Sequence, residues 1–177
     1  MDGNKIIKST KDITLIAVMT TILFVQEQIL TSLPGIQLTV FLMVLYAKKF
    51  GLGKSIIIII IHVLLDNFIM SSFSLMYTPT MLIGWLIIPL TLCTIFKKVD
   101  SPIILAILGA IYSFIYCWLN IIPNYLILHI DPIAYFISDI IFEVVLAVCS
   151  FSTILLLYKP CSKIIDLMRS NSFKTTL

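Results

Sequence analysis

The chain consists mainly of long apolar stretches, which are separated by short polar turns. Six stretches cover residues 13–33, 36–50, 54–70, 80–96, 102–122 and 135–158. A chain of 177 residues has room for six helices of about 20 residues, the length that crosses a bilayer. The stretches are uniformly apolar, whereas a membrane β-strand alternates and needs a closed barrel. The pattern therefore predicts an all-α polytopic membrane protein with six transmembrane helices in one domain, residues 1–177.

The segments between the stretches contain turn-forming residues. Pro34-Gly35 follows the first stretch and Gly51-Leu52-Gly53 the second, and Pro102 suits the first turn of the fifth helix. The connection 123–134 is long enough for a short helix or a reentrant turn. After Pro160, residues 159–177 are expected to form a tail on the cytoplasmic surface.

The composition agrees with a membrane protein, since 60% of the residues are hydrophobic, 12% are charged and the mean hydropathy is +1.11. All twelve Lys and Arg residues fall on one side of the six-helix fold: Lys5, Lys8, Lys11, Lys48, Lys49, Lys54, Lys97, Lys98, Lys159, Lys163, Arg169 and Lys174. Because basic residues accumulate in cytoplasmic loops, both termini are expected to be cytoplasmic, in a bacterial cell membrane. The scattered basic residues, with no aromatic platform, exclude a nucleic-acid partner.

Polar side chains inside the apolar spans concentrate towards the opposite, outer side. Such side chains are costly in lipid and face a cavity or one another. The predicted substrate-binding residues are Gln26, Glu27, Asp66, Asn67, Trp85, Trp118, Asn120, Asn124, Asp139 and Glu143. Five of the six helices contribute polar or tryptophan side chains at similar depth, which predicts a ligand site there.

Each of these residues also has a structural interpretation. His62 and Asp66 are four residues apart and could hydrogen-bond on one helix face, and Asp139 and Glu143 have the same spacing. The two tryptophans could be anchors at the lipid interface. Asn120 and Asn124, beside Pro123, could cap a helix.

The charge of this region narrows the ligand class. It contains four acids and no Lys or Arg, which excludes phosphates and dicarboxylates and favours an amine-bearing or cationic aromatic molecule.

Two distant histidines and four dispersed cysteines make no metal-ligand set, so no metal or cofactor is expected. Gly53-Lys54-Ser55 has the sequence that ends a phosphate-binding loop, but Lys48 occupies the position of the first glycine of that motif. The chain is therefore not expected to hydrolyse a nucleotide itself. No nucleophile with a charge-stabilising partner is evident, so an enzyme is not expected.

The chain resembles the substrate-binding S components of energy-coupling factor (ECF) transporters. The resemblance covers almost the whole chain and depends on the turn Pro34-Gly35-Ile36-Gln37-Leu38-Thr39, on Gly51-Leu52-Gly53 and on Gly84-Trp85. It also depends on Ser138-Asp139-Ile140-Ile141-Phe142-Glu143 and on Leu155-Leu156-Leu157-Tyr158-Lys159-Pro160. In that family, a small-xxx-small face of the first helix packs on the coupling subunit. Ala17 and Thr21 occupy those positions here, with threonine in place of the second alanine.

The resemblance implies uptake of a vitamin or related micronutrient, together with a membrane coupling subunit and two ATPase subunits. Two alternatives remain open: a structural membrane scaffold of the cell-shape (MreD-like) type, and a self-sufficient proton-coupled transporter with Asp66 or Glu143 as the coupling acid. If the acids bind the ligand, Glu27→Gln and Asp139→Asn should each weaken binding at least tenfold, a threshold that corresponds to about 1.4 kcal/mol.

Overall fold

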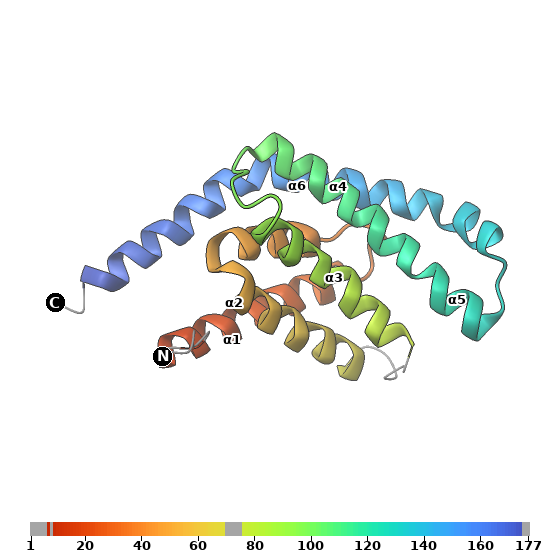
Figure 1. Ribbon diagram of the computed structural model, residues 1–177, viewed down its shortest axis with the longest axis horizontal. Helices are drawn as coiled ribbons and strands as arrows, with labels where there is room; N and C mark the ends of the chain where they lie inside the picture. Colours follow the sequence, from red (N-terminus) through yellow and green to blue (C-terminus); the bar gives the residue numbers. More distant parts are fainter. Residues whose placement is uncertain (1–6, 8, 70–75, 175–177) are drawn as a thin grey trace.

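The structure is a computed structural model that describes residue 7, residues 9–69 and residues 76–174, with side chains described as far as residue 168. Every element in these residues is an α-helix (Figure 1), which confirms the predicted all-α class. Lys5, Lys8, the last residue of the predicted third span (Met70) and residues 71–75, which follow that span, lie outside the described residues. The side chains of Arg169 and Lys174 do so as well.

The helices are α1 (Thr10–Leu30), α2 (Thr39–Ile69), α3 (Tyr77–Cys93), α4 (Pro102–Leu119), α5 (Ile121–Leu128) and α6 (Pro132–Lys174). Within the described residues, four helical stretches are long and apolar enough to cross a membrane: α1, α2, α4 with α5, and α6. The apolar helix α3 is shorter, with 17 residues. The fold is therefore compatible with a membrane-embedded protein, and six crossings remain a prediction.

Gly51 divides α2 into two helical segments that match the predicted second and third spans. Its φ of 77° and ψ of 177° belong to a region that is essentially restricted to glycine. No atom lies within 4 Å of where a Cβ would be, so the backbone angles alone require glycine there. The first segment, residues 39–50, is only about 18 Å long at 1.5 Å per residue. It is shorter than the roughly 30 Å hydrocarbon core of a bilayer.

That first segment is the centre of the fold. All residues from 39 to 47 are buried, as expected for a helix that other helices surround on every side. Fully buried side chains of the neighbouring helices pack around it, among them Leu23, Ile88, Leu105 and Ile154. The outer faces carry large exposed apolar side chains, such as Ile141 at 76% and Leu156 at 70% exposure. Such faces suit contact with lipid.

The last helix continues past the predicted end of the sixth span. Residue 158 was the expected boundary, but α6 continues through Pro160 to Lys174. Proline in a helix removes one backbone hydrogen bond and commonly bends the helix. In Figure 1 the C-terminal part of α6 changes direction, and its end projects beyond the other helices.

The described basic residues gather at one end of the helices. The bend of α2 carries Lys48, whose Nζ donates to the carbonyl oxygen of Phe96 at 2.8 Å, in the turn between α3 and α4. Lys49 pairs with Asp166 of α6 at 2.6 Å, and Lys54 pairs with Asp12 of α1. The bend of α2 therefore contacts both the start of α1 and the C-terminal part of α6 (left side of Figure 1). The turn between α1 and α2, and α5, lie towards the other end.

Candidate functional site: an acidic and aromatic cluster between four helices

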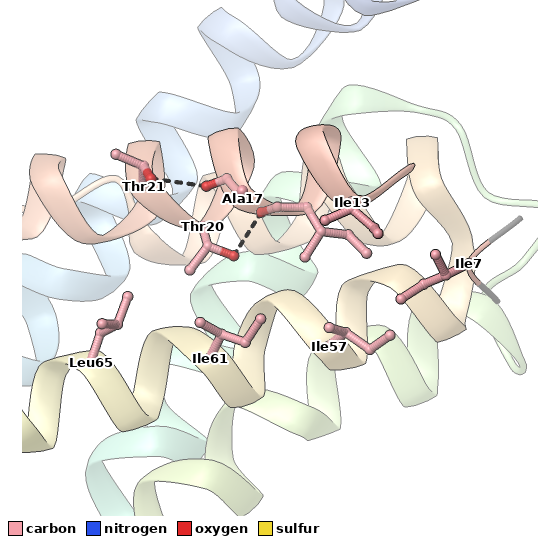
Figure 2. Close-up of a pocket in the computed structure, with 9 residues that line it drawn as sticks. Ile7, Ile13, Ala17, Thr20, Thr21, Ile57, Ile61 and Leu65 are labelled. Carbon is pink, nitrogen blue, oxygen red and sulfur yellow. Dashed lines mark hydrogen bonds between the residues drawn. The ribbon is translucent and has the colours of Figure 1, made fainter. Parts of the chain in front are cut away.

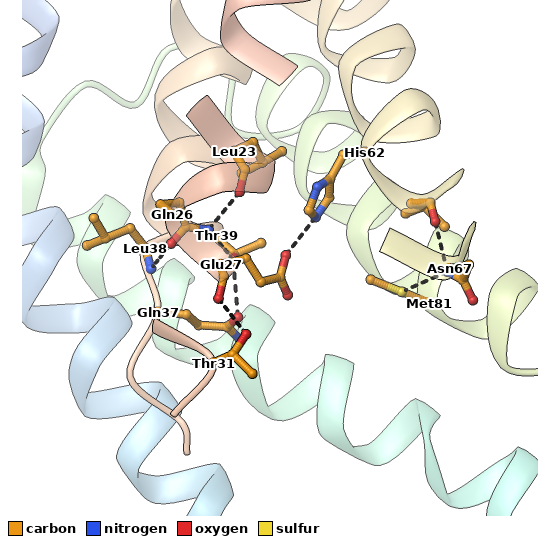
Figure 3. A network of polar contacts seen from close by, with 11 residues as sticks. Leu23, Gln26, Glu27, Thr31, Gln37, Leu38, Thr39, His62, Asn67 and Met81 are labelled. Atoms are coloured by element: carbon orange, nitrogen blue, oxygen red, sulfur yellow. Dashed lines mark hydrogen bonds and ion pairs between the residues drawn. The ribbon is translucent and has the colours of Figure 1, made fainter. Parts of the chain in front are cut away.

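Glu27 and His62 face each other across the α1–α2 interface, near the end opposite to the lysines (Figure 3). Oε2 of Glu27 is 3.1 Å from Nε2 of His62, and the histidine side chain is fully buried. The contact is an ion pair when the imidazole is protonated, but its angles are not those of a hydrogen bond. His62 therefore pairs with Glu27 of another helix rather than with Asp66 of its own. Asp66 is close enough to interact electrostatically with both.

Trp85 of α3 and Tyr116 of α4 lie beside these acids. Their rings stack with centroids 3.9 Å apart and an interplanar angle of 15°. Tyr116 is within electrostatic range of Glu27 and Asp66, so the aromatic pair and the carboxylates belong to the same region of the protein. We call Glu27, His62, Asp66, Trp85 and Tyr116 the acidic–aromatic cluster. Four helices contribute to it.

Gly84 explains how Tyr116 comes so close to α3. A Cβ at this position would lie 2.9 Å from Cδ2 of Tyr116 and 3.5 Å from Cδ1 of Leu119. The Gly84-Trp85 pair of the sequence thus has two linked uses, since the glycine leaves room for the tyrosine ring on which the tryptophan stacks.

Several buried polar atoms of the cluster lack hydrogen-bond partners among the described residues. They are Oε2 of Glu27, both ring nitrogens of His62 and Nε1 of Trp85, whose side chain is 1% exposed. Buried polar groups are nearly always hydrogen-bonded, so each exception calls for an explanation such as water or a ligand. Oε2 of Glu27 and Nε2 of His62 face each other at 3.1 Å, which leaves Nδ1 of His62 and Nε1 of Trp85 without a partner of either kind among the described residues. These two atoms, on two helices, indicate a place where a polar molecule can bind.

A cavity of about 170 Å³ adjoins Glu27. Its walls come from the turn between α1 and α2 and from Phe142 of α6, and Glu27 is the one residue of the acidic–aromatic cluster that lines it. Gly35 in this turn has a φ of 75°, and a Cβ there would lie 3.0 Å from Val145 of α6. The turn therefore packs closely on α6 and forms a wall of the cavity. Ligand pockets usually measure about 300–1,000 Å³, so a vitamin-sized molecule requires movement of this turn.

Two of the predicted binding residues use their polar atoms within the protein. Oε1 of Gln26 accepts from the backbone N–H of Leu38 at 2.9 Å, and its Nε2 donates to Oγ1 of Thr39 at 2.8 Å. The side chain thereby holds the start of α2 against α1 (Figure 3).

Asn67 is similarly occupied. It is buried, its Nδ2 donates to the carbonyl oxygen of Val63, and its Oδ1 accepts from Thr78 at 2.7 Å. Gln26 and Asn67 therefore position the helices around the cluster.

Trp118, Asp139 and Glu143 form a separate group between α4 and α6. Nε1 of Trp118 donates to Oε2 of Glu143 at 3.2 Å, and Asp139 interacts electrostatically with Glu143. Glu143 is 1% exposed, and its Oε1 has no hydrogen-bond partner among the described residues. Trp118 and Tyr116 are two residues apart on α4, about 200° around the helix, so they face different neighbours. The acids and tryptophans of the predicted site thus divide into two groups.

Asn120 and Asn124 lie at the junction of α4 and the short helix α5, which occupies the connection where a short helix was expected. Nδ2 of Asn124 donates to the carbonyl oxygen of Asn120 at 2.7 Å, and its Oδ1 accepts from the Tyr77 hydroxyl at 2.9 Å. Nδ2 of Asn120 donates to the carbonyl oxygen of Tyr116. These bonds agree with the capping interpretation of both residues.

Ala17 and Thr21 lie on the exposed face of α1. They line a groove of about 350 Å³ between α1 and α2, whose other wall includes Ile57, Ile61 and Leu65 (Figure 2). The Thr21 hydroxyl donates to the carbonyl oxygen of Ala17 at 2.9 Å, which satisfies the hydroxyl inside its own helix. The face of α1 that carries Ala17 and Thr21 is therefore exposed, and its one hydroxyl proton is already hydrogen-bonded within the helix.

The predicted residue set omitted Tyr116. The sequence signal for it is weak: Tyr116 is one of several aromatic residues in an apolar span, and only the rotation of α4 separates it from Trp118. Among the described residues, no group of three or more His, Cys, Asp or Glu side chains is placed to hold a metal ion. No protein-family model, curated protein or solved structure matches the chain.

Proposed function

We propose that this chain is the substrate-binding subunit of an ECF-type transporter, for a vitamin or related micronutrient with an amine or cationic group on an aromatic ring. The observation that supports this most is the acidic–aromatic cluster. Buried polar atoms that have no hydrogen-bond partner within the described part of the chain lie there in the same region as a stacked aromatic pair.

The chemistry of the cluster favours this ligand class over others. Glu27 and Asp66 supply two carboxylates for a positive group, and no Lys or Arg belongs to the cluster. Because the rings of Trp85 and Tyr116 stack on each other, the second face of each ring is the one that an aromatic cation would use. Nε1 of Trp85 and Nδ1 of His62, which lack partners among the described residues, are available to polar atoms of the ligand. A phosphate or dicarboxylate would meet repulsion at the same place.

In this proposal the energy comes from partners: a membrane coupling subunit and two ATPase subunits. The protein crosses the bacterial cell membrane six times, with both termini and the lysine-rich end in the cytoplasm, because basic residues favour that side. The ligand cluster then lies in the outer half. Ala17 and Thr21 offer small side chains on an open face of α1, where another helix can approach closely.

The ligand can be identified directly from the purified protein. The protein is transferred from its native membrane into lipid nanodiscs, and small molecules that remain bound are identified by native mass spectrometry. An amine-bearing or cationic heterocycle is expected. An empty protein that is associated only with cell-wall machinery would contradict the proposal and favour the scaffold alternative.

The partner contact is tested by co-purification with the ATPase subunits. Thr21→Trp places a bulky ring on the proposed contact face and is expected to abolish co-purification, while ligand binding stays within twofold. Val148→Trp, at an exposed position of α6, is the matched control and should leave co-purification unchanged. Equal behaviour of the two variants would exclude the α1 face as the contact.

One observation favours the proton-coupled transporter as a second candidate. Glu143 is buried with one unpartnered oxygen among the described residues, and an ionisable residue inside a membrane often has a functional role. Proteoliposomes that contain this chain alone, with an imposed pH gradient, decide between the two functions. Uptake by these proteoliposomes that is lost in Glu143→Gln would favour the proton-coupled transporter. Absence of uptake by the wild-type chain alone would favour the substrate-binding subunit.

A further inference from the structure

A second groove, of about 530 Å³, lies at the lysine-rich end between the start of α1 and the C-terminal part of α6. Its walls are apolar and come from three helices: Leu15, Val18 and Met19 of α1, Phe50 of α2, and Ile165 and Met168 of α6. Val18 and Met168 are 47% and 65% exposed, so the groove is open along its length.

The polar residues of this groove belong to the first turns of α1. Thr10, Lys11 and Thr14 are its polar lining residues, and they span about 6 Å of helix at 1.5 Å per residue. The Thr14 hydroxyl is used within the helix, since it donates to the carbonyl oxygen of Thr10. Lys11 is exposed and lies at the helix N-terminus, where backbone N–H groups and the helix dipole also favour an anion.

The surroundings of the groove are positive. Among the described side chains, eight lysines and three aspartates lie at this end of the helices: Lys11, Lys48, Lys49, Lys54, Lys97, Lys98, Lys159 and Lys163, against Asp12, Asp100 and Asp166. Two of the aspartates are neutralised in the pairs Lys54–Asp12 and Lys49–Asp166. No acidic side chain among those described lines the groove itself.

We propose that this groove binds one anionic phospholipid, with the phosphate at Lys11 and an acyl chain along Leu15, Val18 and Met168. The order of the residues fits such a molecule, because the cation is at one end and the apolar walls continue from it along a helix able to cross the membrane. A small soluble anion would use only the Lys11 end and leave the walls empty. The inference depends on location in a membrane and is independent of the transported ligand.

The test compares two lipids in nanodiscs that contain equal amounts of palmitoyl-oleoyl phosphatidylglycerol and palmitoyl-oleoyl phosphatidylcholine. Lipids that stay bound after release from the nanodisc are counted by native mass spectrometry. The wild-type protein is expected to retain phosphatidylglycerol about fivefold over phosphatidylcholine, which matches the ~1 kcal/mol typical of one basic side chain at an anionic surface.

Three variants test whether the retained lipid is bound in this groove. Lys11→Gln should reduce the preference to about one, while Lys163→Gln, an exposed lysine that does not line the groove, should leave it at fivefold. Val18→Trp fills the groove and should remove the retained lipid. The proposal is overturned by a wild-type protein without preference, by equal losses in the two lysine variants, or by unchanged lipid retention in Val18→Trp.

Discussion

An added Cβ atom at Gly84 would lie 2.9 Å from Cδ2 of Tyr116, whereas carbon atoms pack best about 3.5–4.0 Å apart. In Gly84→Ala the tyrosine ring must therefore move by about 0.6–1.1 Å. Because this ring stacks on Trp85 at 3.9 Å, the movement disturbs the aromatic pair of the acidic–aromatic cluster.

Gly84→Ala is expected to change both the free energy of unfolding and the free energy of ligand binding. Overpacking of a filled interior typically costs about 1–3 kcal/mol in the free energy of unfolding. An aromatic pair contributes about 0.5–1.5 kcal/mol beyond its burial, and the upper part of that range corresponds to roughly tenfold in an equilibrium constant. We therefore expect Gly84→Ala to be less stable and to bind the co-purified ligand about tenfold more weakly.

The assay uses the fact that the chain has only two tryptophans. In a Trp118→Phe background the fluorescence comes from Trp85 alone and reports the environment of the stacked pair. Gly84→Ala should change this emission in the folded protein. Gly109→Ala is the matched control, because a Cβ there would contact Ile154 between α4 and α6. It should lower stability without changing the emission. Unchanged emission and ligand affinity in folded Gly84→Ala would refute the arrangement described for Tyr116.

Two further substitutions test how the helices are positioned. Gln26→Ala removes the hydrogen bonds to Leu38 and Thr39 and leaves a backbone N–H unpaired, which should lower the free energy of unfolding by about 1–3 kcal/mol in denaturant titrations; no loss would mean that water replaces these bonds. Gly51→Ala should cost about 1–3 kcal/mol because of its backbone angles, although no atom is near its Cβ. Gly53→Ala, which has no positive φ, should cost much less, and equal losses would contradict this explanation.

Local patterns in the sequence were sufficient for the helices and for the bend in α2. Uniformly apolar stretches predict helices, and Gly51 lies where the turn between the second and third spans was expected. The end of α6 was not predictable in this way. Pro160 commonly marks a boundary, yet here the helix continues to Lys174, because proline can be accommodated in a helix at the loss of one hydrogen bond.

The depth of a polar residue along a helix can be predicted from the sequence, but its partner on another helix cannot. His62 and Asp66 have helical spacing, yet Nε2 of His62 lies 3.1 Å from Glu27. Trp118 and Tyr116 have similar depth, but the rotation of α4 places only Tyr116 beside Trp85. Residue type alone also does not separate Gln26, whose amide holds two helices together, from a residue that binds ligand.

The central claim is that the acidic–aromatic cluster, rather than the group between α4 and α6, binds a cationic ligand. Isothermal titration of the co-purified ligand into nanodiscs of wild type, Glu27→Gln and Asp139→Asn tests it most directly. Since Glu27 belongs to the cluster and Asp139 does not, we expect at least tenfold weaker binding in Glu27→Gln and less than a twofold change in Asp139→Asn. Equal affinity in all three proteins, or a loss only in Asp139→Asn, would contradict the claim.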